Sequence, residues 1–98
     1  MRRNKLALYL HLVWATWDRF PLITPNIERR LHRNIESEAR GMGCTVLALN
    51  GTSDHVHLVI SFPSTVPLAN VVKQVKGVSS HFVNETLQPE AQFKWQGC

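Results

Sequence analysis

The strict alternation of apolar residues near the N-terminus constrains the fold more than any other feature of this sequence. Between positions 6 and 17, leucine or tryptophan fills every second position up to Trp14. Successive side chains of a strand point to opposite faces, so this period of two predicts a strand with one buried face. The opposite, less apolar face carries Ala7, Tyr9, His11, Val13 and Ala15.

Two amphipathic helices and further short strands follow in an informative order. Thr24 and Pro25 are typical of a helix start, and apolar residues then recur every fourth position until glycines end the helix. A second apolar stripe begins at Leu68. In chain order we predict a strand over 6–17, a helix over 25–41, strands over 44–49 and 53–62, a helix from Leu68 to about Glu85, and a strand over 93–96.

This order predicts an α+β fold, the ferredoxin-like split βαβ arrangement. Its sheet would have four antiparallel strands, with both helices on one face. The first and third strands would be central neighbours, and the leucine face would lie under the helices. Asn50 and Gly51 are typical of a tight turn and predict a hairpin between the second and third strands.

Length and composition restrict the class of protein. The 98 residues make one domain, 1–98, and the net charge of +4 favours an anionic partner. The two cysteines, Cys44 and Cys98, form no CxxC pair, which fits a reducing compartment. The basic start and the apolar run after it resemble a signal peptide, but His11 interrupts the run and no cleavage site follows. We therefore expect a cytoplasmic protein without a membrane span.

The segment SDHVHLVISF places two histidines on one strand face. His55 and His57 are two residues apart, hence about 6.6 Å along a strand, while Val56 and its apolar neighbours point to the helix-covered face. Two imidazoles at this spacing can tilt onto one divalent cation, provided that another ligand or substrate oxygens complete the shell. Asp54 directly before the pair favours a metal site. An exposed pair that binds nothing is the other interpretation of this spacing.

Four segments together resemble one family. DHVHLVI resembles the histidine-hydrophobe-histidine motif of single-tyrosine transposases of the insertion-sequence 200/605 type. HLVWATWDRFPL is similar to that family's first strand and following turn, VVKQVKGVSSHF to its lysine-glycine-serine helix, and FKWQG to the start of its last strand. The resemblance covers essentially the whole chain.

The resemblance implies a homodimeric enzyme that cleaves and rejoins single-stranded DNA, often beside a hairpin. A tyrosine attacks the phosphodiester and becomes linked to the 5′-phosphate, while His55 and His57 help to hold Mg²⁺ or Mn²⁺. The family's tyrosine lies on a helix after the last strand, so we expect it downstream of Cys98. The one tyrosine here is Tyr9, which does not match that motif. The resemblance therefore implies a chain without its nucleophile, and an inactive fragment.

Basic residues and His11 are the candidate DNA contacts. Lys73 and Lys76 form one polar stripe on the second predicted helix, and Arg19 follows the first strand. We expect these basic residues to contact DNA, with the protein at the nucleoid when bound. His11, on the open face beside the histidine pair, could contact DNA or the metal shell, and a hydrogen-bonded histidine of the sheet is the other interpretation. Two other interpretations stay open: a non-enzymatic module for single-stranded nucleic acid on the same fold, and an inert remnant of a mobile element.

Overall fold

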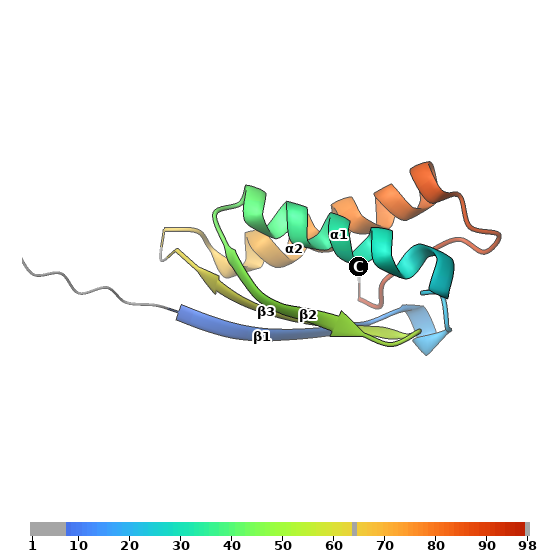
Figure 1. Ribbon diagram of the computed structural model, residues 1–98, viewed down its shortest axis with the longest axis horizontal. Helices are drawn as coiled ribbons and strands as arrows, with labels where there is room; N and C mark the ends of the chain where they lie inside the picture. Colours follow the sequence, from blue (N-terminus) through green and yellow to red (C-terminus); the bar gives the residue numbers. More distant parts are fainter. Residues whose placement is uncertain (1–7, 64, 98) are drawn as a thin grey trace, which may run out of the picture.

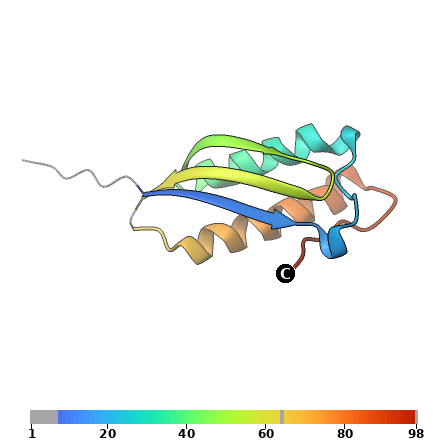
Figure 2. The ribbon, with the colours of Figure 1, turned by 90° about the horizontal axis from the view of Figure 1, so that it is seen from below.

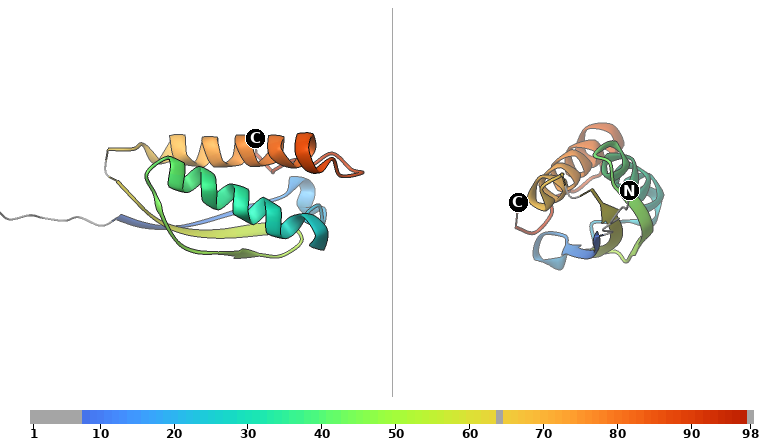
Figure 3. Two further views of the ribbon diagram at one scale, coloured as in Figure 1. Left: turned by 45° about the horizontal axis from the view of Figure 1, so that its top comes forward. Right: turned by 90° about the vertical axis from the view of Figure 1, so that its left-hand side faces the viewer.

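The protein folds into two layers, a sheet and a pair of helices (Figure 1). The computed structural model describes residues 8–63 and 65–97, so Leu6 and Ala7 of the first predicted strand lie outside the described residues. Both helices cover the same face of the sheet, as the end-on view in Figure 3 shows. The elements are β1 (Leu8–Ala15), η1 (Trp17–Arg19), α1 (Pro25–Gly41), β2 (Thr45–Gly51), β3 (His55–Phe62), α2 (Leu68–Phe82) and η2 (Val83–Leu87).

The sheet is antiparallel and its strand order is β1-β3-β2, with β3 in the centre. Figure 2 shows its uncovered face toward the viewer. In the register, Leu58 of β3 lies between Leu12 of β1 and Leu49 of β2. Because these residues share one face, the sheet presents a continuous apolar surface to the helices.

The helices supply the other half of the core. Four residues of α1 at fourfold spacing are buried, as the sequence predicts, and α2 buries Val71 and Val75 at the same spacing. They pack on Val56, Leu58 and Ile60 of β3, each with no exposed surface. Burying such side chains is worth about 1.5–3 kcal/mol each. The core therefore lies between the layers and leaves the far face of the sheet free.

The four-stranded ferredoxin-like sheet predicted from the sequence is wrong, although the fold is α+β. The described residues form a three-stranded sheet, in which β1 is an edge strand rather than a central one. The predicted strand 93–96 makes a single bridge, Trp95 to Thr16, at the end of β1.

The segment is held by contacts along both of its edges, and the course of β1 limits how far it pairs. The Asn84 side chain bonds both backbone groups of Phe93, accepting from its N–H at 2.8 Å and donating to its carbonyl at 2.9 Å. The chain of β1 also turns away into η1 directly after Thr16. Beside the bridge, the Trp17 N–H donates to the Lys94 carbonyl at 2.9 Å and the Gln96 N–H donates to the Ala15 carbonyl at 2.8 Å. Phe93 and Trp95 are buried, so the segment is anchored by side-chain packing as well as by this short pairing with the end of β1.

The hairpin turn also differs from the prediction. Asn50 and Gly51 belong to β2, and Gly51 pairs with Val56. The connecting loop is Thr52, Ser53 and Asp54, closed by a hydrogen bond from the Thr52 N–H to the His55 carbonyl at 2.9 Å. The turn is thus shifted toward the histidines, and its polar side chains lie beside them.

Candidate functional site

His55 and His57 lie on the open face of the central strand, as their alternation predicts. Val56 and Leu58 point into the core with no exposed surface, while both imidazoles are partly exposed. Across the sheet, His55 faces Ala15, and His57 lies between Val13 and Asn50. The two rings are 4.8 Å apart between centroids and tilted by 64°. The small Ala15 side chain leaves room beside His55.

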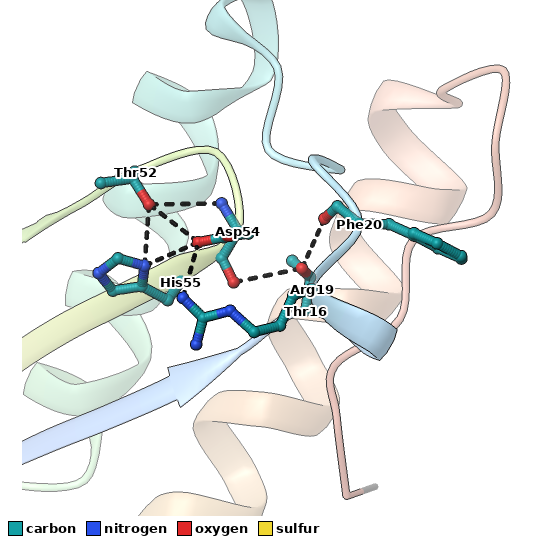
Figure 4. Close-up of polar contacts among 6 residues, drawn as sticks. All are labelled: Thr16, Arg19, Phe20, Thr52, Asp54 and His55. Carbon is teal, nitrogen blue, oxygen red and sulfur yellow. Dashed lines mark hydrogen bonds and ion pairs between the residues drawn. The ribbon is translucent and has the colours of Figure 1, made fainter.

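His55 is held by the hairpin loop (Figure 4). Its Nδ1 lies 2.8 Å from Asp54 Oδ1 and 2.8 Å from Thr52 Oγ1. The Thr52 hydroxyl is also 3.1 Å from the same carboxylate oxygen. An ionised carboxylate only accepts hydrogen bonds, so His55 Nδ1 carries the proton that it shares with Asp54. Its Nε2 therefore keeps a free lone pair.

Asp54 is the centre of this cluster. The hydrogen bond from His55 lowers the pKa of the Asp54 carboxyl, and the Thr52 hydroxyl and the charge of Arg19 act in the same direction. Arg19 lies 3.4 Å from Asp54 Oδ1, with 64% of its side chain exposed. Asp54 is thus an anion near neutral pH, which favours the orientation of His55 described above.

A strained turn after β1 brings Arg19 to the loop. Asp18 and Arg19 both have positive φ, 53° and 55°, which costs energy in residues other than glycine. The buried Thr16 hydroxyl donates to the Phe20 carbonyl at 2.6 Å, and the Asp18 N–H donates to Gln96 Oε1 at 2.8 Å. These bonds hold the turn beside Asp54, and strain of this kind is often found at functional sites.

His11 lies next to the histidine pair. Its Nε2 is 3.1 Å from Nδ1 of His57, and the ring centroids are 5.2 Å apart. The structure therefore brings His11, His55 and His57 together on one face of the sheet. It also brings Arg19 close to the site, through Asp54.

Lys73 and Lys76 are not brought to the histidines. Both are on α2, which covers the opposite face of the sheet. They line a shallow, mostly apolar groove of about 700 Å³ together with Val72 and Gly97. Lys76 donates a hydrogen bond from Nζ to the Gln96 carbonyl at 3.0 Å. A DNA contact at these lysines would be separate from the histidine site.

Tyr9 shares the open face and neighbours His11 on β1 but is distant from His55 and His57. It lies opposite Ser61, four residues along β3 from His57, which corresponds to about 13 Å. Its side chain is 62% exposed.

The donor set fits a divalent cation of the first transition row. The two imidazoles lie on one strand face, and each Nδ1 is engaged by a neighbouring side chain, so Nε2 is the atom of each ring that can turn to a metal. Across residues 8–63 and 65–97, no group of three or more histidine, cysteine or acidic side chains is arranged to hold a metal. Water, phosphate oxygens or a further ligand would have to complete the shell.

Sequence reasoning missed three residues of this region. Thr52 and Gln96 hold His55 and the strained turn, and Thr16 connects that turn to the hairpin loop through a contact with the Asp54 carbonyl at 3.2 Å. The small polar residues TSD before the histidines are a signal for a side-chain-bonded loop. Nothing in the local sequence indicates the role of Gln96, which is 78 residues from Asp18.

The same architecture occurs in solved transposase structures. A candidate transposase from Deinococcus radiodurans R1 is similar with a TM-score of 0.87 and 23% identity, over 100% of this chain and 82% of that one. A REP-associated tyrosine transposase bound to a REP hairpin is similar with a TM-score of 0.69 and 12% identity, over 100% of this chain and 58% of that one. No curated protein matches. At these identities the likeness establishes the fold alone.

Family membership follows from the sequence match. The family model described as "Transposase IS200 like" matches residues 4–98. The chain therefore belongs to the IS200-like transposase family, and single-stranded DNA transposition is the function that this membership supports. Among the described residues, neither helix is long and apolar enough to cross a membrane.

Proposed function

We propose that the open face around His55 and His57 is the metal-holding part of an enzyme that cleaves and rejoins single-stranded DNA. One observation carries this proposal. Each imidazole has its Nδ1 engaged by a neighbouring side chain, His55 with Asp54 and His57 with His11. Among the described residues, neither Nε2 has a hydrogen-bond partner; His55 Nε2 is available as a ligand, and His57 Nε2 is available when His57 carries its proton on Nδ1.

A divalent cation, Mg²⁺ or Mn²⁺, held by these two Nε2 atoms would polarise a phosphodiester and stabilise the charge that builds on it. Asp54 orients His55 by accepting the hydrogen bond from its Nδ1–H. The open sheet face gives an extended strand access to the site, because no described element covers it.

We do not assign the nucleophile to Tyr9. The resemblance to single-tyrosine transposases implies that a tyrosine forms a 5′-phosphotyrosine link as the 3′-hydroxyl leaves, and that the reverse step joins strands. Tyr9 lies about 13 Å along the strand from His57, and its place in the first strand does not match the family's motif. The tyrosine expected after Cys98 stays a prediction, which the coding DNA beyond that codon would test.

We further propose that Lys73, Lys76 and Arg19 contact DNA phosphates. Lys73 is exposed on α2, and Arg19 keeps most of its guanidinium exposed despite its contact with Asp54. Because Lys73 and Lys76 lie on the helix layer, DNA that reaches both them and the histidines would pass around the β1 edge of the sheet. Following the resemblance, we expect a homodimer that acts in the cytoplasm at the nucleoid.

Calorimetric titration with Mn²⁺ tests the metal site. We expect the wild-type chain to bind Mn²⁺ in the presence of a short single-stranded oligonucleotide, and the His55→Ala, His57→Ala double variant to lose this binding. His81→Ala is the matched control, because His81 is exposed on α2. Equal Mn²⁺ binding by the wild type and the double variant would refute the metal site.

Salt dependence of oligonucleotide binding tests the DNA contacts. Each phosphate contact that is lost should reduce the slope of log K against log salt by about 0.7 for a single strand. We expect this reduction for Lys73→Ala and Lys76→Ala, and no change for Arg29→Ala on the exposed surface of α1. Unchanged slopes in both lysine variants would contradict the assignment.

A further inference from the structure

The contact between His11 and His57 follows from the register of β1 and β3. His11 lies opposite Val59, and Val13 lies opposite His57, so the two histidines are diagonal neighbours on the open face. Diagonal neighbours are within reach of each other when their side chains are long or aromatic. His11 Nε2 and His57 Nδ1 are 3.1 Å apart, which is a hydrogen-bond distance.

Only one proton arrangement of this contact leaves His57 able to bind a metal through Nε2. A neutral imidazole has one N–H and one lone-pair nitrogen. If His57 Nδ1–H donates to His11 Nε2, then His57 Nε2 has a free lone pair. If His11 Nε2–H donates instead, the His57 proton is on Nε2, and that atom cannot be a ligand.

The neighbouring histidine provides a parallel within the same site. His55 Nδ1 lies 2.8 Å from the Asp54 carboxylate, which accepts a hydrogen bond from Nδ1–H and leaves His55 Nε2 free. His57 has no carboxylate at its Nδ1, and the partner at that position is His11. The two imidazoles thus have different partners at equivalent atoms.

We propose that His11 is a positioning residue whose Nε2 accepts the hydrogen bond from His57 Nδ1–H and so fixes the His57 tautomer in which Nε2 is the metal ligand. This inference rests on the proposed metal-holding function of His55 and His57. His11 is not itself a ligand, because its Nε2 is occupied by His57 and no three-ligand group exists among the described residues. The role differs from the DNA contact expected from the sequence.

Two variants of His11 distinguish the effect of its hydrogen-bond acceptor from the effect of its size. His11→Phe keeps a flat ring on the strand and removes the accepting nitrogen, whereas His11→Gln places an amide oxygen at a similar reach. Tyr9→Phe is the matched control, because Tyr9 is on the same strand and face without contacting His57. All proteins are compared in the same buffer.

The first readout is Mn²⁺ affinity by calorimetry. Partners that orient a metal-binding histidine typically contribute 10–100-fold to metal affinity. We expect His11→Phe to weaken Mn²⁺ binding by about 10-fold or more. His11→Gln should restore most of the affinity, and Tyr9→Phe should bind as the wild type does.

The second readout is the tautomer of His57 in the metal-free protein, measured by long-range ¹H–¹⁵N NMR correlation. We expect the proton on Nδ1 in the wild type and in His11→Gln, and a shift toward Nε2–H in His11→Phe. This measurement needs no metal, so it tests His11 even if the wild type fails to bind Mn²⁺ and the proposed function falls.

Three results would overturn the inference. One is a wild-type His57 that carries its proton on Nε2. Another is a His11→Phe variant with unchanged tautomer and affinity. The third is a His11→Gln variant that binds Mn²⁺ as weakly as His11→Phe, because restoring a hydrogen-bond acceptor would then have no effect.

Discussion

Replacing Gly51 with alanine should destabilise the protein although Gly51 has an ordinary extended backbone. It is the last residue of β2 and pairs with Val56. A Cβ added at this position would overlap with the His55 carbonyl oxygen and would lie 3.0 Å from Val56 Cα. Both contacts are with backbone, which cannot rotate away as a side chain can. The ends of β2 and β3 would have to separate.

The cost follows from this displacement. Forcing an extra carbon into a well-packed position typically costs about 1–3 kcal/mol. The His55 carbonyl also accepts the hydrogen bond from Thr52 that closes the loop, so its movement weakens that contact as well. We expect Gly51→Ala to lower the free energy of unfolding by about 2 kcal/mol, and to weaken Mn²⁺ binding because His55 moves.

Gly77 provides a matched control with the opposite sign. It lies inside α2, and an added Cβ would meet nothing within 4 Å. Gly77→Ala should therefore raise the free energy of unfolding by about 0.5–1 kcal/mol through the higher helix propensity of alanine. Urea denaturation followed by circular dichroism measures both variants. A Gly51→Ala protein within about 0.5 kcal/mol of the wild type would refute the close approach.

Two further predictions concern the core and the pH dependence of stability. Trp95→Phe should lower the free energy of unfolding by about 1–3 kcal/mol, because it leaves a cavity and removes the Nε1–H donor to Ser79 Oγ at 3.0 Å. Trp17 is partly exposed, so the control variant Trp17→Phe should stay within about 0.5 kcal/mol of the wild type. Equal urea midpoints for the two variants would contradict this prediction. Burial lowers the pKa of the His32 imidazole below its ordinary value of 6.5, so the unfolded chain takes up a proton that folded His32 resists, and stability should fall as pH drops from about 7.5 to about 5.5. His32→Gln should flatten this dependence in urea titrations at the two pH values, and an unchanged slope would argue against the assignment.

Much of the fold was predictable because it depends on local periodicity. The fourfold spacing in α1 and the alternation in β3 identify the buried positions, and Leu31 and Val56 have no exposed surface in the structure. The same alternation correctly assigns His55 and His57 to the uncovered face. The roles of the histidines, of Arg19 and of the two lysines remain predictions.

Two predictions about the fold were wrong: the strand over 93–96 and the turn at Asn50 and Gly51. Both depend on how one segment of the chain pairs with another. The segment containing Phe93 and Trp95 alternates as a strand should, but the chain of β1 turns into η1 directly after Thr16, so pairing is limited to the bridge between Thr16 and Trp95. Asn50 and Gly51 resemble a tight turn, yet the glycine serves a close approach between strands. Local propensity predicts neither the end of β1 nor the close approach at Gly51.

The sequence by itself determined the faces of the strands, the extents of the helices and the family, because side-chain alternation and helical spacing are properties of neighbouring residues. Only the tertiary structure decided the number of strands, the contact of His11 with His57 and the approach of Arg19 to Asp54. Those contacts join positions 46 and 35 residues apart. They depend on the register of β1 against β3 and on the strained turn after β1. Such geometry is set by packing between layers, which no local pattern encodes.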